Sequence, residues 1–475
     1  MEGPVVLEQG RRWAQRLFGA CDLGDPRRVE RLVEVAGVLA DEPGASLARA
    51  CGDDGAAREG AYRLVRNEQV DAQAIAEGAF AATALAAGRV EGDLVISQDT
   101  TVVSYAHAAA GGLGDLGGPE ATPGRGWQVH NSLLVEGAGG QAVGLIDQEW
   151  WTRAARGRGR RHGRKERPYT QKESYKWEQA ARRAAGRLGP ELTRRVVWVS
   201  DRESDVYEYL RYQQEAGQRF VVRVEQDRSL APDPGQEHRR LYQALALAPE
   251  MGRLVVQVPQ RGGRPAREAL VGLRAKRLRL NPPPRGGGTK LPALRLNAVR
   301  VEEIDPPPGE AGLSWLLYTS EPIDTPQQVG RVMGIYRLRW RVEDYHKCWK
   351  SGTKVERLRL QSPENLRRLG TILAHVAVRV LQLHDVANDA REASKSVLER
   401  LAPEEWQCLW KSTEGGRPLP PQPPTLGWAA CALGRLGGWG DTKRTGRIGF
   451  EALWRGWLRL QDRLIGWQQA LSGVV

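Results

Sequence analysis

The stretch GDLVISQDTTVVSY, residues 92–105, decides the fold class of this chain. Its β-branched residues predict a strand that ends in an acid, Asp99, followed by two threonines. A second predicted strand, Val196–Val199, ends in another acid, Asp201. Helical and strand-like segments alternate around both, which is typical of an α/β sheet. We therefore expect the two acids to converge at one edge of that sheet.

A helix predicted from YRLRWRVEDYHKCWK, residues 336–350, brings a third acid to this edge. At about 100° per residue, four polar side chains would share about 60° of arc, namely Tyr336, Arg339, Glu343 and Lys350. The opposite stripe is apolar and consists of Leu338, Val342, Tyr345 and Trp349. This apolar stripe is typical of a helix face that packs on a core.

Asp99, Asp201 and Glu343 together predict an all-oxygen metal site. Three carboxylates suit hard divalent cations, so we expect Mg²⁺ or Mn²⁺. Two such ions about 4 Å apart can activate a water or a 3′-hydroxyl and stabilise the leaving oxygen of a phosphodiester. Taken singly, each strand-end acid could be a turn or N-cap residue, and Glu343 could pair with Lys347 on the helix surface. The joint pattern is what favours catalysis.

The charge balance of the chain favours a polyanionic partner. The 475 residues suggest about three domains, and their net charge of +13 attracts nucleic acid or an anionic surface at long range. A merely soluble, basic protein would have the same charge. The most apolar segment is interrupted by His375, Arg379 and His384, so we expect no membrane span, and no signal peptide is apparent. Five scattered cysteines predict neither a zinc site nor a disulfide framework, which fits a reducing cytoplasm.

The first 90 residues read as a helical domain with a basic surface. Asp25 and Pro26 form an N-cap and a first helical turn. The basic side chains are Arg27, Arg28, Arg31, Arg63 and Arg66. Such arginines are either a solvated face or a set of phosphate contacts. A second basic segment, the Arg-rich block 153–167, predicts a flexible loop that could also contact DNA.

Two further segments flank or interrupt the predicted core. Residues 230–312 alternate apolar and polar side chains with period two, which predicts a small antiparallel β insertion. After a Pro/Gly-rich hinge, the tail ends in a helix with an apolar and aromatic stripe, which would pack on the body or on another subunit. That stripe comprises Leu453, Trp454, Trp457, Leu458, Leu464 and Ile465.

These motifs together resemble the bacterial DDE transposases of the insertion-sequence-four group. The spacing of Tyr336, Arg339, Glu343 and Lys350 matches their Tyr-x-x-Arg-x-x-x-Glu-x-x-x-x-x-x-Lys signature. The resemblance extends over nearly the whole chain. The stretches that carry it are LGDPRRVERLV, GAYRLVRN, DTTVVSY, GLIDQEWW, SDRESDVYEYL, WLLYTSEP, NLRRLGTILAHVAVRVLQL and LWRGWLRLQDR.

The resemblance implies an RNase H-like catalytic core over residues 91–390, interrupted by the β insertion. A helical DNA-binding domain, 1–90, would precede this core, and a helical dimerisation domain, 391–475, would follow it. Asp99, Asp201 and Glu343 would hold two Mg²⁺ or Mn²⁺ ions. Tyr336, Arg339 and Lys350 would hold phosphates of a transposon end, and Trp315 would stack on an extruded base. Without the resemblance, Trp315 would be read as a core aromatic residue.

The reaction implied by this family is cut-and-paste transposition. A homodimer pairs two transposon ends, nicks one strand, forms and reopens a hairpin, and joins the end to target DNA. Such a protein would be bacterial and cytoplasmic, and it would associate with the nucleoid when bound to DNA. Two other hypotheses are a structure-selective DNA nuclease of the same fold and a DNA-binding regulator without catalysis.

Overall fold

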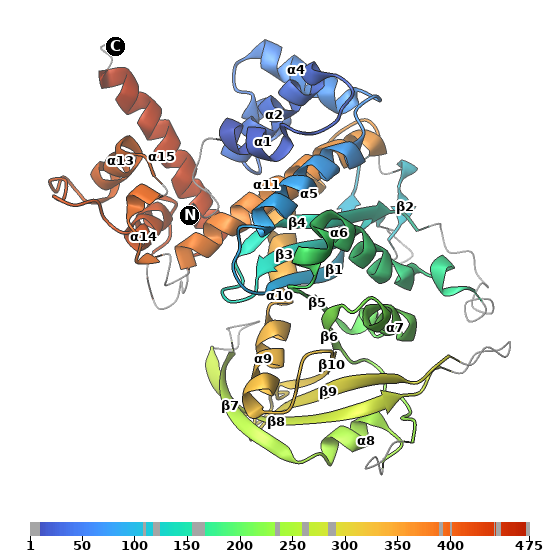
Figure 1. The fold of residues 1–475 in the computed structure, drawn as a ribbon. Helices are drawn as coiled ribbons and strands as arrows, with labels where there is room; N and C mark the ends of the chain where they lie inside the picture. The colour runs from blue at the N-terminus through green and yellow to red at the C-terminus, as the bar shows by residue number, and fades with distance from the viewer. Residues whose placement is uncertain are drawn as a thin grey trace.

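A computed structural model gives the fold of the chain (Figure 1). The residues that it describes are 10–107, 111–116, 124–153, 167–232, 238–258, 266–283, 291–388, 393–399, 401–440, 442 and 448–471. Most of the Arg-rich block, residues 154–166, lies outside the described residues, so its suggested DNA contact stays a prediction.

One large mixed sheet runs through the molecule (Figure 1). Its strands are β1 (Leu94–Tyr105), β2 (Gly114–Asp115), β3 (Arg125–Glu136), β4 (Ala142–Trp151), β5 (Val196–Ser200), β6 (Arg219–Arg223), β7 (Glu250–Val258), β8 (Arg267–Leu280), β9 (Leu294–Glu303) and β10 (Ser314–Thr319). Their order is β2-β3-β1-β5-β6-β10-β9-β8-β7, and β4 also pairs with β3. The neighbours β1, β5 and β6 are parallel, while the other pairs are antiparallel. The α/β expectation is thereby confirmed.

Strand β1 does not end at Asp99, contrary to the prediction. It pairs with β5 only as far as Ser97, but it continues beside β3 to Tyr105 because the longer β3 keeps its backbone groups hydrogen-bonded. Asp99 therefore lies two residues beyond the last parallel pair, where β5 has already ended. Asp201 directly follows β5, so the two acids still lie at the same edge of the parallel strands.

The β insertion is part of the main sheet and not a separate unit. Strands β7, β8 and β9 form the expected antiparallel ladder. However, β9 also pairs with β10, and β10 pairs with β6, so the ladder extends the central sheet on one side. The β6–β10 pairing satisfies backbone groups that an isolated insertion would leave at an exposed edge.

Helices cover both faces of this sheet. One face packs against α9 (Pro326–Arg337), α10 (Trp340–Lys347) and α11 (Pro363–Asn388), and the other against α6 (Lys176–Thr193), α7 (Tyr207–Glu215) and α8 (Leu241–Ala246). The helix predicted at about 171–188 is shifted toward the C-terminus, since α6 begins at Lys176 and ends at Thr193. Short 3₁₀ turns precede α6, and Gly189 has a φ of 73° where the helix kinks before Pro190.

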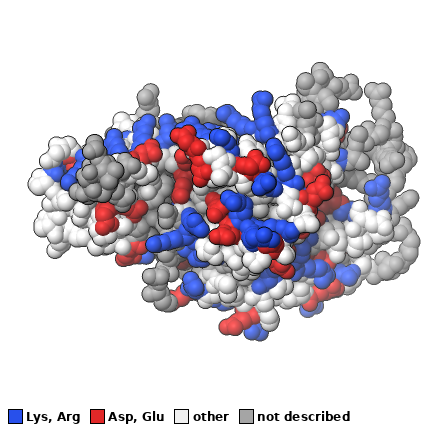
Figure 2. Space-filling view, turned by 90° about the horizontal axis from the view of Figure 1, so that it is seen from above, with Lys and Arg blue, Asp and Glu red and all other residues white. Residues whose placement is uncertain are grey.

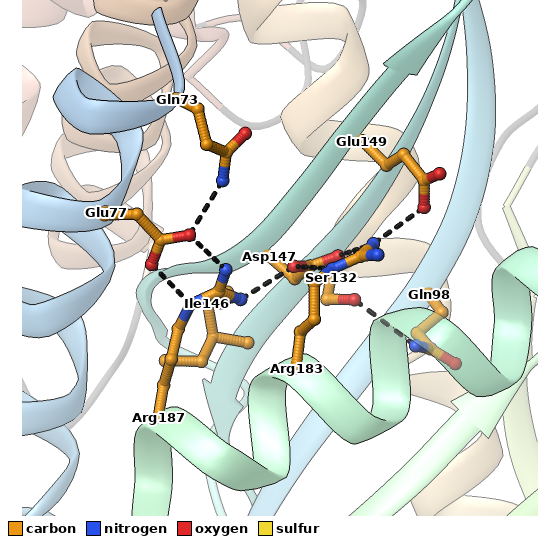
Figure 3. Close-up of polar contacts among 9 residues, drawn as sticks. All are labelled: Gln73, Glu77, Gln98, Ser132, Ile146, Asp147, Glu149, Arg183 and Arg187. Atoms are coloured by element: carbon orange, nitrogen blue, oxygen red, sulfur yellow. Dashed lines mark hydrogen bonds and ion pairs between the residues drawn. The ribbon is translucent and has the colours of Figure 1, made fainter. Parts of the chain in front are cut away.

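A cluster of ion pairs fastens helices α5 and α6 to strand β4 (Figure 3). Asp147 on β4 is buried and accepts hydrogen bonds from Arg183 Nε at 2.8 Å and Arg187 Nη1 at 2.7 Å. Arg183 also reaches Glu149 on β4 at 2.7 Å, and Arg187 reaches Glu77 on α5 at 2.6 Å. Every charge in the cluster has an opposite partner, which offsets the cost of burying Asp147.

The N-terminal helices pack on α11. They are α1 (Gly10–Phe18), α2 (Pro26–Asp41), α3 (Leu47–Ala50), α4 (Gly55–Arg66) and α5 (Ala72–Ala87). The predicted N-cap is confirmed, because the Asp25 side chain accepts from the backbone N–H of Arg27. Arg368 on α11 donates to Val70 O at 2.6 Å and to Val65 O at 3.1 Å. His375, also on α11, has ring contacts with Phe18 and Phe80 at 5.7 Å each.

The C-terminal helices lie at the other end of α11 (Figure 1). They are α13 (Pro403–Thr413), α14 (Leu426–Leu436) and α15 (Phe450–Leu471). The first half of the predicted stripe on α15 is buried against this same chain, at Leu453, Trp454 and Trp457, whereas Ile465 is exposed. Gly456 permits this packing because a Cβ there would lie 1.8 Å from Leu433 O. Within the described residues, no helix is long and apolar enough to cross a membrane, and all five cysteines are free.

We expect His375→Leu to make the fold more resistant to mild acid. Burial lowers the pKa of His375 from 6.5 to about 3, so the unfolded chain binds a proton here that the folded chain does not. The free energy of unfolding therefore falls as pH drops through that range, by about 2 kcal/mol at about pH 5. The leucine variant does not lose this free energy of unfolding, because its side chain binds no proton in either state. Its urea midpoint should fall less than that of the parent between about pH 7.5 and pH 5. The half-exposed His238, changed to Leu, is the control, and equal falls in parent and variant would contradict the expectation.

Candidate active site

The predicted single helix over 336–350 is broken into three parts. Helix α9 ends at Arg337, α10 begins at Trp340, and residues 348–352 form one turn of π-helix. The joint has the tighter i to i+3 pattern, with Arg339 N bonded to Tyr336 O at 3.0 Å. Ser97 Oγ on β1 donates to Leu338 O at 2.9 Å, which ties this joint to the acid-bearing strand. The prediction of one uninterrupted polar face is therefore wrong. The predicted apolar stripe is nevertheless buried at Val342, Tyr345 and Trp349.

The joint places Arg339 between two of the three acids. Its Nη2 lies 2.6 Å from Glu343 Oε1, and its Nη1 lies 3.7 Å from Asp99 Oδ2. Arg339 is only 5% exposed, and its guanidinium stacks over the Trp340 ring at 4.5 Å. A buried guanidinium at this distance acts as a counter-ion for both carboxylates.

Asp99 is the acid of this site with the most strongly raised pKa. Burial is the largest cause, and together with the negative charges of Asp201 and Glu343 it raises the pKa of Asp99 from 3.8 to about 7. The Thr100 N–H, which donates to Asp99 Oδ1 at 2.7 Å, and the Arg339 charge act in the opposite direction. Asp201 and Glu343 therefore both lie close enough to Asp99 to repel its charge.

Asp201 has a second, local role. It caps the 3₁₀ turn Arg202–Ser204 by accepting from Glu203 N at 2.9 Å, as the plainer reading of a strand-end acid predicts. Burial raises the pKa of Asp201, and the Arg339 and Lys176 charges oppose that rise. The sequence did not single out Lys176, whose ammonium lies 3.3 Å from Glu203. The cap leaves the other oxygen of Asp201 available to a ligand.

The three carboxylates have the donor chemistry of a magnesium site. Among the described residues, no group of three or more His, Cys, Asp or Glu side chains is arranged closely enough to hold a metal ion. The Arg339 guanidinium occupies the space between Asp99 and Glu343. Their mutual repulsion is what a divalent cation would offset, and carboxylate oxygens are its preferred ligands.

Tyr336 and Trp315 lie together on one side of Arg339. Their ring centroids are 5.5 Å apart in an edge-to-face arrangement. Tyr336 is 1% exposed, and its hydroxyl has no hydrogen-bond partner in the part of the chain that the structure describes. Burial raises the pKa of Tyr336, while the charges of Arg339 and Arg223 lower it. Arg223, at the end of β6, is a cation beside the site that the sequence did not single out.

Lys350 lies on the π-helical turn, held by a carboxylate. Its ammonium is 3.8 Å from Glu356 Oε1. The same oxygen accepts from Ser104 N at 2.9 Å and from Ser104 Oγ at 3.1 Å, which links Lys350 to the far end of β1. The sequence offered no signal for Glu356, because its partners come from a distant strand.

The five N-terminal arginines lie at or near the surface, and each has a partner within the chain. Three form ion pairs: Arg27 with Asp25 at 3.0 Å, Arg31 with Glu34 at 2.7 Å and Arg63 with Glu59 at 3.7 Å. Arg28 donates to Leu23 O at 2.8 Å, and Arg66 lies over the Tyr62 ring at 5.2 Å. Basic and acidic side chains are interspersed on the face that Figure 2 shows. A phosphate could replace exposed acid partners of this kind at little cost.

Comparisons with known families match two parts of the chain. A transposase DNA-binding model matches residues 10–70, which hold the first four helices. A transposase DDE domain model matches residues 177–379. The second match contains Asp201 and Glu343 and begins after β1, which carries Asp99.

With a chelator present, we expect Asp99→Asn to stabilise the fold at about pH 8 but not at about pH 4. The raised pKa of Asp99 means that the folded chain holds this proton more tightly than the unfolded chain. The free energy of unfolding therefore falls as pH rises from about 4 to about 7. The amide does not ionise, so it should raise that free energy by about 1–3 kcal/mol at the higher pH. Thermal midpoints of parent, variant and the exposed control Asp53→Asn measure the difference, and equal midpoints at the higher pH would refute it.

Proposed function

Because this chain carries a transposase DNA-binding domain and a transposase DDE domain, we propose that it is a cut-and-paste DNA transposase. A DDE domain implies metal-dependent DNA cleavage and strand transfer. Our finer assignment is to the insertion-sequence-four group, with a resemblance to the Tn-five transposase. Strands β4, β3, β1, β5 and β6 are our candidates for its RNase H-like core.

The observation that supports this proposal is that three acids from three separate elements all interact with the charge of Arg339. Asp99 comes from the middle of β1, Asp201 from the end of β5 and Glu343 from α10. Asp201 and Glu343 raise the pKa of Asp99, and such charge repulsion is unfavourable for the fold alone. Such an arrangement is typical of a site that binds cations.

Each residue of the site has a proposed part in the reaction. Two Mg²⁺ or Mn²⁺ ions held by Asp99, Asp201 and Glu343 would activate the attacking hydroxyl and stabilise the leaving oxygen. Arg339, displaced from the carboxylates, would then be free to bind a phosphate with its planar fork. Lys350 would supply a point charge to another phosphate. Tyr336 would donate a neutral hydrogen bond from its hydroxyl.

Trp315 is our candidate for the residue that holds an extruded base. It is half-buried on β10, with its ring against Tyr336. Stacking on an aromatic face is worth about 1–3 kcal/mol per base and tolerates any base identity. A base beside the scissile bond could therefore leave the duplex without a specific pocket.

Recognition of the ends and pairing of the subunits are assigned to the flanking domains. We propose that residues 1–90 bind the end repeats, with Arg27, Arg28, Arg31, Arg63 and Arg66 as phosphate contacts. Residues 91–390 would cut and join, and residues 391–475 would form the homodimer of the synaptic complex. Acting on bacterial DNA, the protein would work in the cytoplasm at the nucleoid.

The decisive experiment first searches the DNA on both sides of the gene for inverted repeats and then uses them as duplex substrates. Asp99→Ala, Asp201→Ala and Glu343→Ala should each keep end binding in a gel-shift assay and lose more than about 100-fold of Mg²⁺-dependent cleavage. Strand transfer into plasmid DNA is scored in the same reactions. Cleavage without joining by the parent would instead support the nuclease hypothesis, and three active alanine variants would rule out the metal assignment.

Lys350→Ala should reduce the salt dependence of end binding. Each lost phosphate contact lowers the slope of log K against log salt by about 1. The matched control is Lys347→Ala on the same helix, because Lys347 is 68% exposed and pairs with Asp344, whereas Lys350 is 31% exposed beside the site. Fluorescence anisotropy titrations at several salt concentrations measure both slopes. An unchanged slope for Lys350→Ala would exclude its phosphate contact.

A further inference from the structure

Behind the three acids, a buried hydrogen bond joins the helix of Glu343 to the strand beside Asp99. We propose that this Asn131–His346 bond is a positioning contact that sets the location of Glu343 relative to Asp99. The inference rests on the proposed function and deepens it. Neither residue is assigned a direct part in the reaction.

The bond joins β3, the neighbour of the strand that carries Asp99, to α10, the helix that carries Glu343. Asn131 lies on β3 directly opposite Asp99 on β1, so both side chains point to the same face of the sheet. His346 lies on α10 three residues after Glu343, close to the same side of that helix. Asn131 Nδ2 is 3.0 Å from His346 Nε2, and both side chains are buried.

A chain of hydrogen bonds fixes the direction of this contact. Gln148 on β4 donates from Nε2 to Asn131 Oδ1 at 2.8 Å, and Trp150 Nε1 donates to Gln148 Oε1 at 2.8 Å. The amide nitrogen of Asn131 therefore faces His346, whose Nε2 must accept. Burial lowers the pKa of His346 to about 3, which keeps the ring neutral, and the Asn131 donor selects the tautomer whose proton is on Nδ1.

Helix α10 needs such a contact because its own backbone is interrupted on both sides. It has 8 residues, begins after the joint at Leu338 and Arg339, and ends in the π-helical turn. Ser97 holds the start of this segment through Leu338 O. Beyond Glu343, the segment is held by the Asn131–His346 bond and by a hydrogen bond from Gln148 Nε2 to the Tyr345 hydroxyl at 3.3 Å. The carboxylate therefore lies between attachments to the sheet on both sides.

A neighbouring hydrogen bond provides a matched control. Ser132 follows Asn131 on β3, and its hydroxyl accepts from Gln98 Nε2 at 3.3 Å, as Figure 3 shows. Successive side chains of a strand point to opposite faces, so this bond faces α7, where Tyr209 donates to Gln98 at 3.0 Å. Ser132→Ala thus removes a buried hydrogen bond from the same place in the sheet without touching α10.

The test compares His346→Leu with His346→Gln in the full chain. The Gln side chain can place an acceptor oxygen near the position of Nε2, whereas Leu has none. Affinity for Mn²⁺ in the complex with end DNA is read from the electron paramagnetic resonance signal of free Mn²⁺. The Mg²⁺ concentration for half-maximal cleavage and the thermal midpoint are measured on the same samples.

We expect His346→Leu to weaken Mn²⁺ binding about 10-fold and to raise the Mg²⁺ requirement in parallel, as for other contacts that orient a ligand. Ser132→Ala should lower the thermal midpoint without moving either metal readout. His346→Gln should return both metal readouts to within about 3-fold of the parent. Asn131→Ser removes the same bond from the sheet side and should repeat the shift, so an unfolded His346→Leu would not end the test.

Two results would overturn the positioning role. One is parent-like Mn²⁺ affinity in folded His346→Leu or Asn131→Ser, and the other is a His346→Gln variant that behaves like His346→Leu. Failure of the proposed function gives a different pattern, because the parent itself would then neither bind Mn²⁺ with end DNA nor cleave it.

Discussion

The repulsion that Asp201 and Glu343 exert on the charge of Asp99 is the constraint on which the candidate site depends. The three carboxylates come from β1, from the residue after β5 and from α10, and burial of Asp99 adds to the rise of its pKa. Arg339 is the counter-ion within reach of two of them, at 2.6 Å and 3.7 Å. Removing the Arg339 guanidinium from water costs free energy. That cost is offset only if the surrounding residues hold the guanidinium in good geometry beside the two acids. The joint between α9 and α10, with Trp340 stacked on the guanidinium, provides these surrounding residues.

The same arrangement suggests how the site could exchange one cation for another. The Arg339 guanidinium lies between two of the carboxylates. A divalent ion that binds the same carboxylates would compete with it for that space. In our proposal, Arg339 is released toward a phosphate when the carboxylates take up metal. Binding of the DNA end and assembly of the metal site would thereby be coupled through one side chain.

Helix α11 packs against the N-terminal helices, the C-terminal helices and the sheet. It lies under the N-terminal helices through Arg368 and His375, and its other end packs against α14 and α15. It also contacts the π-helical turn that bears Lys350. A rigid central helix of this kind can hold a DNA-binding unit at a constant distance from the acids. That is a geometric requirement for cutting at a defined position from a recognised sequence.

Local signals in the sequence were enough for the individual elements. Asp25 and Pro26 predicted the start of α2, β-branched runs predicted the first part of β1 and β5, and the spacing of Val342, Tyr345 and Trp349 predicted a buried face. The three acids were chosen from their places after strands and on a helix. What the sequence could not indicate were the contacts that position them.

The sequence by itself thus determined which residues could form the site, and the tertiary structure decided how they are held. Strand β1 continues past Asp99 because β3 outlasts β5, and the β insertion joins the main sheet because β10 links β9 to β6. The helix breaks at Leu338 and Arg339, where Ser97 binds its backbone. Asn131 and His346 meet although they are 215 residues apart. Periodicity and propensity report only neighbours within a few residues, whereas each of these features depends on a partner brought close by folding.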